Sequence, residues 1–249
     1  MAGPRKPHGT VELTIKNAAA RLDAAAIRVD TLHAQVELPS RVCHLSAEDA
    51  DVIYWADAGC ASIESMDADL IASPVAGSPD IDIRGTIERG KHLNVKVFAR
   101  YQPRTSDLAV NALELDAVLA PPLFAMLPPP LRDFVTKHDL AGAFRGRVSG
   151  TVALGDASQT RLDGTFQLSR AQFTCGGLDW RLARLNLTGP LPDGPLTITG
   201  EDIAAVPGED RDGAPPPLLA VAKVVCAIPE IPREGRPLAI DSLEFDAPR

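Results

Sequence analysis

The stretch Ser149–Ser169, SGTVALGDASQTRLDGTFQLS, twice places a Gly-Thr pair before strand-forming residues. The pattern starts a little earlier, at Phe144. From there the even positions hold Phe, Gly, Val, Gly, Val and Leu, whereas the odd positions hold Arg, Arg, Ser, Thr and Ala. A period of two places these sets on opposite faces of a β-strand. The stretch therefore predicts strands with one apolar and one polar face.

The same alternation recurs along most of the chain, and Gly-Thr pairs also occur at Gly9 and Gly85. Strands with one apolar face are expected at 10–16, 80–87, 93–101, 144–154 and 161–168, with weaker alternation at 113–119, 185–187 and 196–198. Roughly ten to thirteen strands fit, joined by turn-rich stretches. The sequence thus predicts a mainly β protein.

Glycines stand on the apolar faces of these strands, where a neighbouring side chain would otherwise fill space. A glycine inside a strand costs roughly 0.5–1 kcal/mol, but it allows the sheet to bend and another body to approach its surface. A bulge or corner in an ordinary β-sandwich is the alternative explanation. The expected sheet-bending glycines are Gly85, Gly146, Gly150 and Gly164.

The composition describes an aliphatic, acidic protein. Hydrophobic residues make up 45% of the chain and aromatic residues only 4%, which favours an open trough because sandwich cores usually contain more Trp, Tyr and Phe. The net charge is −8, and the 25 Lys and Arg residues are scattered rather than clustered. Nucleic acid is therefore not an expected partner.

A proline-rich segment divides the chain. Within it Leu131, Phe134, Val135 and His138 share one helical face, so a short amphipathic helix is expected after the proline triplet. A second acidic and proline-rich stretch reads as a mobile loop. The expected organisation is an N-terminal β region at 1–119, the proline-rich segment and helix at 120–139, and a C-terminal β region at 140–249 with the mobile loop at 204–219.

No motif predicts catalysis, a metal site or a cofactor site. The five histidines are not arranged as metal ligands, and the four cysteines lie far apart without a C-x-x-C pair. Buried free thiols are expected, although a bridge between Cys43 and Cys60 remains open if the chain is exported. We therefore expect a non-enzymatic protein without metal or cofactor.

Between Leu140 and Gly200 the successive segments GAFRGRVSGTVAL, TRLDGTFQLSRAQF, LARLNLTGPL and LTITGED resemble the AsmA-like superfamily, which includes TamB- and YhdP-type bacterial proteins. The resemblance implies a long curved antiparallel sheet that forms an open, taco-like groove with an aliphatic concave face. It also implies a role in carrying lipid acyl chains between the membranes of diderm bacteria. A β-sandwich serving as a structural scaffold or surface-protein module without ligand is the alternative.

The expected partners are phospholipid or another acyl lipid, with inner- and outer-membrane proteins as further candidates. No apolar run approaches the ~18 residues that a membrane-spanning helix needs. The chain itself is therefore expected to be soluble, and the resemblance implies that it is a piece of a longer, membrane-anchored protein of the periplasm or cell envelope. The residues expected to line the groove are Val11, Leu13, Ile15, Ile81, Ile83, Ile87, Leu93, Val95, Val97, Val148, Val152, Leu154, Phe166 and Leu168.

Overall fold

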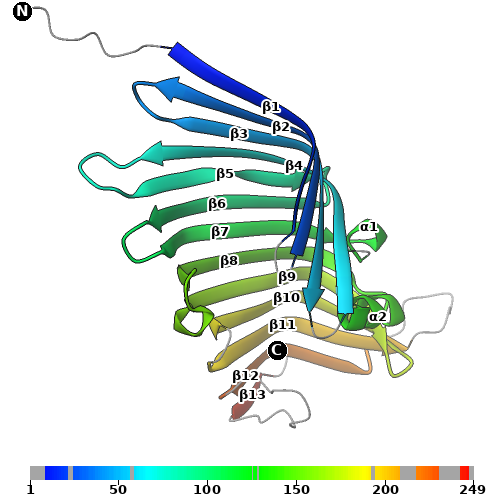
Figure 1. Ribbon diagram of the computed structural model, residues 1–249. Coiled ribbons are helices and arrows are strands. Elements are labelled where there is room, and N and C mark those ends of the chain that lie inside the picture. Colours follow the sequence, from blue (N-terminus) through cyan, green and yellow to red (C-terminus); the bar gives the residue numbers. More distant parts are fainter. Residues whose placement is uncertain are drawn as a thin grey trace, which may run out of the picture.

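Thirteen strands form one open antiparallel sheet in which each strand pairs with the next along the chain (Figure 1). The computed structural model describes residues 9–21, 25–56, 59–124, 126–127, 129–191, 194–207, 217–229 and 242–246. The predicted long antiparallel sheet is confirmed, and the described residues contain no second sheet, so the sandwich alternative is wrong.

Two short helices interrupt the order of strands between β7 and β8. The strands are β1 (Gly9–Arg21), β2 (Ala25–Leu38), β3 (Cys43–Ala56), β4 (Gly59–Pro74), β5 (Ile81–Arg89), β6 (Leu93–Gln102), β7 (Asp107–Leu119), β8 (Ala141–Ala153), β9 (Arg161–Cys175), β10 (Leu178–Leu191), β11 (Leu196–Pro207), β12 (Leu219–Ile228) and β13 (Ser242–Asp246). The helices are α1 (Pro121–Phe124) and α2 (Pro129–Lys137), and a 3-10 turn covers Ala157–Gln159.

A crease crosses the sheet and divides it into two walls. Single residues with a left-handed backbone conformation lie along it. Beyond each of them, the alternation of side chains between the two faces of the sheet shifts by one residue. In β1, for example, Ile15 pairs with Leu32 before the crease and Ala18 pairs with Val29 after it. The crease residues with positive φ are Asn17 (54°), Asp49 (51°), Ser65 (55°), Arg170 (52°) and Asp202 (49°).

The residue types at the crease suit this backbone. Asn and Asp are enriched in the left-handed region because their short polar side chains can hydrogen-bond locally. Two carboxylates also satisfy amides at the crease: Asp49 N–H donates to Asp67 Oδ1 at 3.2 Å, and Ser65 N–H donates to Asp51 Oδ1 at 3.1 Å. A carboxylate of each strand thus accepts a hydrogen bond from a backbone amide of the other strand. These two amides therefore keep a partner where the alternation shifts.

A strand that crosses the crease contributes one part to each of the two walls. The long wall contains 9–16, 31–38, 43–48, 66–74, all of β5 and β6, and the continuing parts of β7 to β13. The short wall contains 18–21, 25–29, 50–56, 59–64, 171–175, 178–182, 203–207 and 219–221. Figure 1 shows β1 to β4 turning sharply between the two walls.

The helices occupy the place that β5 to β7 leave empty in the short wall. The β5–β6 turn lies at the crease, so neither strand continues beyond it. There α1 contacts β7 and α2 contacts β4. At the other end of the insertion, Thr174 N–H in β9 donates to the His138 carbonyl at 2.7 Å. The helical segment thus connects the two strand portions of the short wall.

Arg89, the last residue of β5, links this insertion to β4. Its Nε donates to the Glu64 carbonyl at 2.7 Å, and its Nη1 donates to the Pro122 carbonyl, also at 2.7 Å. Because β5 ends at Arg89, the guanidinium donates to the Glu64 carbonyl of β4, which faces no further residue of β5, and also holds α1 through Pro122.

Two buried clusters hold the walls together. Val29, Ala50 and Met66 lie just beyond or beside the crease and pack with long-wall residues that include Leu32 and Ile87. The second cluster joins the sheet to α1 and the residues that follow it: Leu93, Ala117, Leu123 and Met126. Contacts across the crease therefore place the apolar face on the inside of the bend.

The expected N-terminal and C-terminal β regions share one sheet, because β7 pairs with β8 across the helical segment, and the division into regions stays a prediction. Helix α2 agrees with the expected amphipathic helix, but Phe134 is 54% exposed while Val135 is buried, and α1 was not expected. Residues 204–207 of the expected mobile loop belong to β11, and 208–216 lie outside the described residues. Cys43 is a free thiol, so the possible bridge to Cys60 is not formed.

We expect Asp202→Val to lower the free energy of unfolding by about 1–2 kcal/mol, because a β-branched residue disfavours the left-handed backbone at the crease. Asp202→Gly should change it little. Urea unfolding would measure both, with Thr197→Val on the exposed face of the same strand as the control. Equal stability of the Val and Gly variants would show that the crease does not depend on this backbone conformation.

We expect Arg89→Leu to cost about 1–3 kcal/mol, since two carbonyls lose their charged donor. The loss should be local, so amide hydrogen exchange should accelerate most in α1, which contains Pro122, and in the short-wall part of β4. Arg84→Leu, an exposed change on the outer face of the same strand, is the control. Uniform acceleration over the whole sheet would contradict the assigned role.

Candidate functional site

The main candidate site is the concave face, where apolar residues align across the sheet. Direct cross-strand partners form one row that passes through every strand without a polar side chain. From β1 to β13 this row contains Ile15, Leu32, Ala47, Ala68, Ile87, Val95, Leu115, Gly146, Phe166, Leu187, Ile198, Cys226 and Leu243.

Neighbouring rows continue the apolar surface on both sides of the first. Toward the outer rim of the long wall, a row from Leu13 to Gly189 includes Leu45, Val97 and Val148. Toward the crease, a row from Leu93 to Phe245 includes Phe144 and Leu168. Twelve strand spacings of about 4.8 Å give this surface a length of about 58 Å.

The opposite face is polar in register with these rows. The corresponding row on the outer face runs through Thr14, His33, Ser46, Asp69, Thr86, Lys96, Glu114, Arg147, Thr165, Thr188 and Thr197. Arg145 pairs with Asp116 at 2.8 Å on this face, and Arg147 pairs with Glu114 at 3.4 Å. The two faces therefore differ sharply in chemistry from β1 to β11, whereas the row continues in β12 with Ala227.

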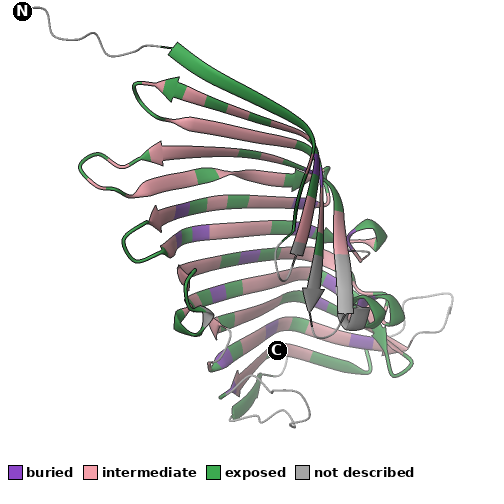
Figure 2. Cartoon of the chain, viewed as in Figure 1, coloured by how far each residue is buried: buried purple, intermediate pink, exposed green. Residues whose placement is uncertain are grey.

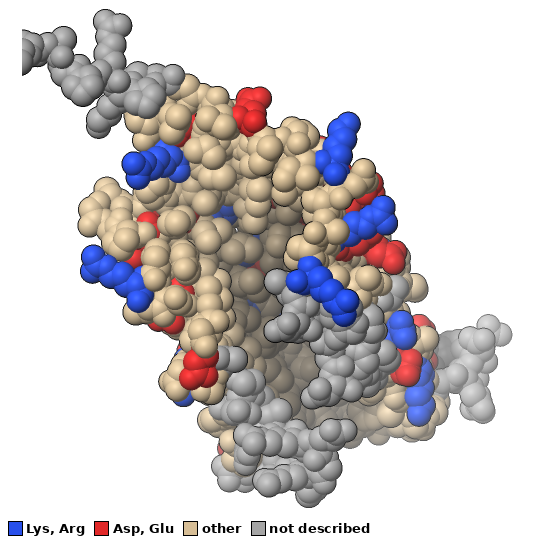
Figure 3. All heavy atoms as spheres, viewed as in Figure 1, with Lys and Arg blue, Asp and Glu red and all other residues tan. Residues whose placement is uncertain are grey.

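The concave face is only partly covered. Val11, Leu13 and Ile15 at the β1 edge are 58%, 55% and 40% exposed, and Phe245 at the β13 edge is 62% exposed. Most residues between these edges are neither fully buried nor fully exposed (Figure 2). Figure 3 shows a hollow between the walls, flanked by uncharged residues, with charged side chains mainly toward the outer margins of this view.

The residues that the sequence predicted to line a groove lie on this face, with one exception. Thirteen of the fourteen belong to strands, and each has at least one apolar or glycine partner on a neighbouring strand. Leu154 follows the end of β8, is 60% exposed, and donates its N–H to the Ser106 carbonyl. The alternation continued past the point where the strand ends, so placing Leu154 in the strand was wrong.

The four glycines also lie on the concave face, but neighbouring atoms occupy the space above them. A Cβ on Gly164 would lie 2.6 Å from Phe166 Cε2 and 2.8 Å from Leu191 Cδ1, and one on Gly146 would lie 3.0 Å from Phe166 Cδ1. Their sheet-bending role stays a prediction. The observed role of Gly146 and Gly164 is to allow Phe166 to lie close to the sheet.

Several residues of the concave face were missed by the sequence analysis. They lie mainly in β2, β3 and β4, and in the short wall, where the phase change interrupts the alternation. Across the crease, the successive residues of the apolar face are Leu32 and Val29 in β2, and Ala47 and Ala50 in β3. Their spacing in the sequence is three residues rather than two. A change of phase that recurs near an Asn or Asp is the signal that could have found them.

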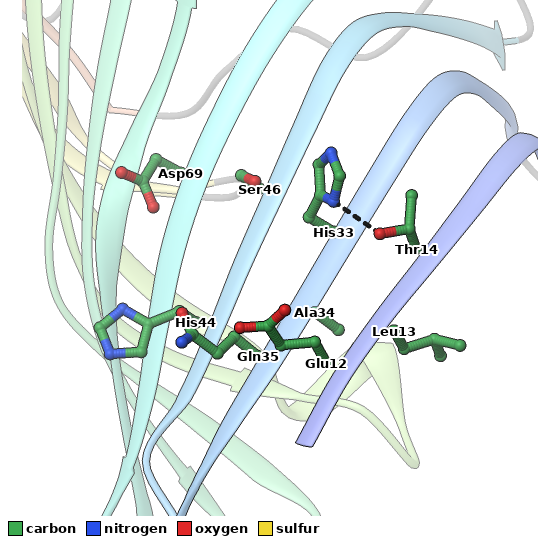
Figure 4. Close-up of a pocket in the computed structure, with 9 residues that line it drawn as sticks. All are labelled: Glu12, Leu13, Thr14, His33, Ala34, Gln35, His44, Ser46 and Asp69. Atoms are coloured by element: carbon green, nitrogen blue, oxygen red, sulfur yellow. Dashed lines mark hydrogen bonds between the residues drawn. The ribbon is translucent and has the colours of Figure 1, made fainter. Parts of the chain in front are cut away.

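A second candidate is a polar depression of about 350 Å³ on the outer face of β1 to β4. Figure 4 shows His33 bonded to Thr14, with 2.9 Å between Nδ1 and Oγ1, and Ser46 on the neighbouring strand. In a catalytic triad, one ring nitrogen of the His faces the Ser hydroxyl, and the other ring nitrogen is hydrogen-bonded to a carboxylate. Because Thr14 is the observed partner of Nδ1, this arrangement does not form a triad.

The groups with shifted pKa values lie away from the concave face. The hydrogen bond and charge of Asp82 raise the pKa of Arg100 on the outer face. In the β8–β9 loop, hydrogen bonds from the Ser158 hydroxyl and amide lower the pKa of Asp156. Among the described residues, no group of three His, Cys, Asp or Glu is arranged to hold a metal ion. Neither described helix is long and apolar enough to cross a membrane.

Comparison with known proteins adds no relative. No protein-family model, curated protein or solved structure matches the chain.

We expect Gly164→Ala to destabilise the protein by about 1–3 kcal/mol, because the new methyl group would overlap Phe166 and Leu191. Phe166→Leu in the same chain should recover part of this loss by removing the ring. A double-mutant cycle in urea would measure the coupling. Additive effects of the two substitutions would contradict close packing at this position.

Proposed function

We propose that the chain is a non-enzymatic module whose concave face holds the acyl chains of lipids. The supporting observation is the apolar row that runs through all thirteen strands, on a face that no second sheet of the described residues covers. Each methylene that leaves water for such a surface contributes about 0.8 kcal/mol. An apolar face of this length would otherwise exceed the few hundred Å² that monomers commonly expose.

The direction of the row suits a path rather than a single pocket. It runs across the strands, so a ligand that moves along it meets apolar residues, most of them aliphatic, from Ile15 to Leu243. Aliphatic walls without hydrogen-bonding groups hold hydrocarbon without fixing its position. Such a surface fits transport of acyl chains better than recognition of one polar ligand.

The resemblance to the AsmA-like superfamily supports the finer part of this proposal. On that basis the chain belongs to a longer, membrane-anchored protein of the cell envelope, and it carries phospholipid or another acyl lipid through the periplasm between the two membranes. Membrane proteins at either end are its proposed protein partners.

Lipid bound to the purified chain provides the direct test. We expect mass spectrometry of an organic extract to find phospholipid or fatty acid, and lipid-stripped protein to bind an apolar dye. Val148→Glu, in the middle of the long wall, should remain folded because its carboxylate can reach water along the open face. Its bound lipid should fall about tenfold, since acyl chains would have to lie against a charge.

Thr165→Glu is the matched control, because Thr165 lies on the outer face directly opposite Arg147. It should leave the bound lipid unchanged. If the parent chain carries no lipid and binds no dye, the groove hypothesis fails and a structural scaffold becomes the better account. If both Glu variants lose lipid equally, the lipid is not held by the concave face.

A further inference from the structure

Strand β1 lies at one edge of the sheet that the described residues form. Among the described residues it pairs with β2 only, and nearly all of its residues are exposed. It contains no proline, and no charged side chain on its apolar face. Natural sheets usually protect a long edge with such devices, because free N–H and C=O groups offer a template for another strand. The free N–H and C=O groups of β1 can therefore pair with a further strand.

The crease restricts which strand can pair there. The side-chain alternation of a partner strand must shift by one residue beside Asn17, where the alternation of β1 shifts. Without this shift, the apolar residues of the partner would lie on the outer face beyond that point. The strand at the other edge, β13, is described as five residues with one uninterrupted alternation, from Ser242 to Asp246. It could match one wall only. Of the two edge strands, β1 alone has the crease that a partner of β1 requires.

We propose that β1 pairs antiparallel with β1 of a second copy, around a two-fold axis between Lys16 and Asn17. In this register Ile15 faces Ala18 of the second copy, and Leu13 faces Ala20. Apolar residues then meet apolar residues on both sides of the axis, and both creases coincide. The symmetry is isologous, so the pairing closes as a dimer and does not extend into a filament.

The charges on the polar face agree with this register. Glu12 of each copy faces Arg21 of the other, which gives two opposite-charge pairs per dimer, and no like charges face each other directly. The axis stands perpendicular to the sheet, so both concave faces lie on the same side. The two apolar surfaces would then form one continuous groove. This pairing goes beyond the proposed function and does not depend on lipid.

The first test measures the mass of lipid-stripped chain by light scattering across a dilution series. We expect a dimer whose dissociation constant rises about three- to tenfold in Glu12→Arg and in Arg21→Glu, because each places two like-charge pairs in the interface. The double variant, with the charges exchanged, should recover the parent value. A monomer throughout the series, or a double variant that behaves as the sum of its parts, would overturn the proposal.

The second test fixes the register with cysteines. Thr14 and Ala19 face each other across the proposed axis at a paired-strand distance of about 4.5–5.5 Å, which allows a disulfide. The double variant Thr14→Cys, Ala19→Cys should therefore give covalent dimers under mild oxidation. Thr10→Cys with Ala19→Cys, four residues out of register, should give only the background of the parent chain. Equal yields from the two pairs, or none from the first, would reject this interface.

Discussion

A single sheet has to cover its own apolar face, and the crease is how this protein does so. A bend alone would not be enough. The left-handed residue at the bend shifts the side-chain alternation by one residue, so a sequence that kept a spacing of two through the bend would turn its apolar residues outward beyond it. The left-handed residues at Asn17, Asp49 and Asp202 shift the alternation at the bend itself. Apolar side chains from both walls therefore meet inside, as Val29 and Leu32 do.

The meander order makes this structure nearly one-dimensional. Among the described strands, each hydrogen-bonds only with the strands before and after it in the sequence. Stability then comes from successive strand pairs, much as in repeat proteins, rather than from one central core. This explains why the buried residues are few and often small, such as Ala99, Ala171 and Ala205, while most of the apolar face remains half-buried.

The sequence predicts the long wall well and the short wall poorly, for one physical reason. Period-two alternation is unbroken in β5, β6 and the first part of β9, so residues such as Ile83, Val97 and Phe166 could be assigned to the concave face. The crease turns the spacing into three between Leu32 and Val29, which conceals β2 and β3 from a search for alternation. Arg89 shows a further limit, because its partners Glu64 and Pro122 come together only in the folded chain.

The helical insertion gives the groove an uneven cross-section. Where β5 to β7 stop at the crease, Leu123 and Met126 pack onto Leu93 and Ala117 and bury the base of the long wall. Toward the β1 edge no described helix covers the concave face, and Ile15 in the central row is 40% exposed. For the proposed lipid, acyl chains near the middle would have to lie above this cluster, toward the rim of the long wall, whereas at the edges they could reach the crease. The helices would thereby set the depth at which a hydrocarbon chain passes the centre of the sheet.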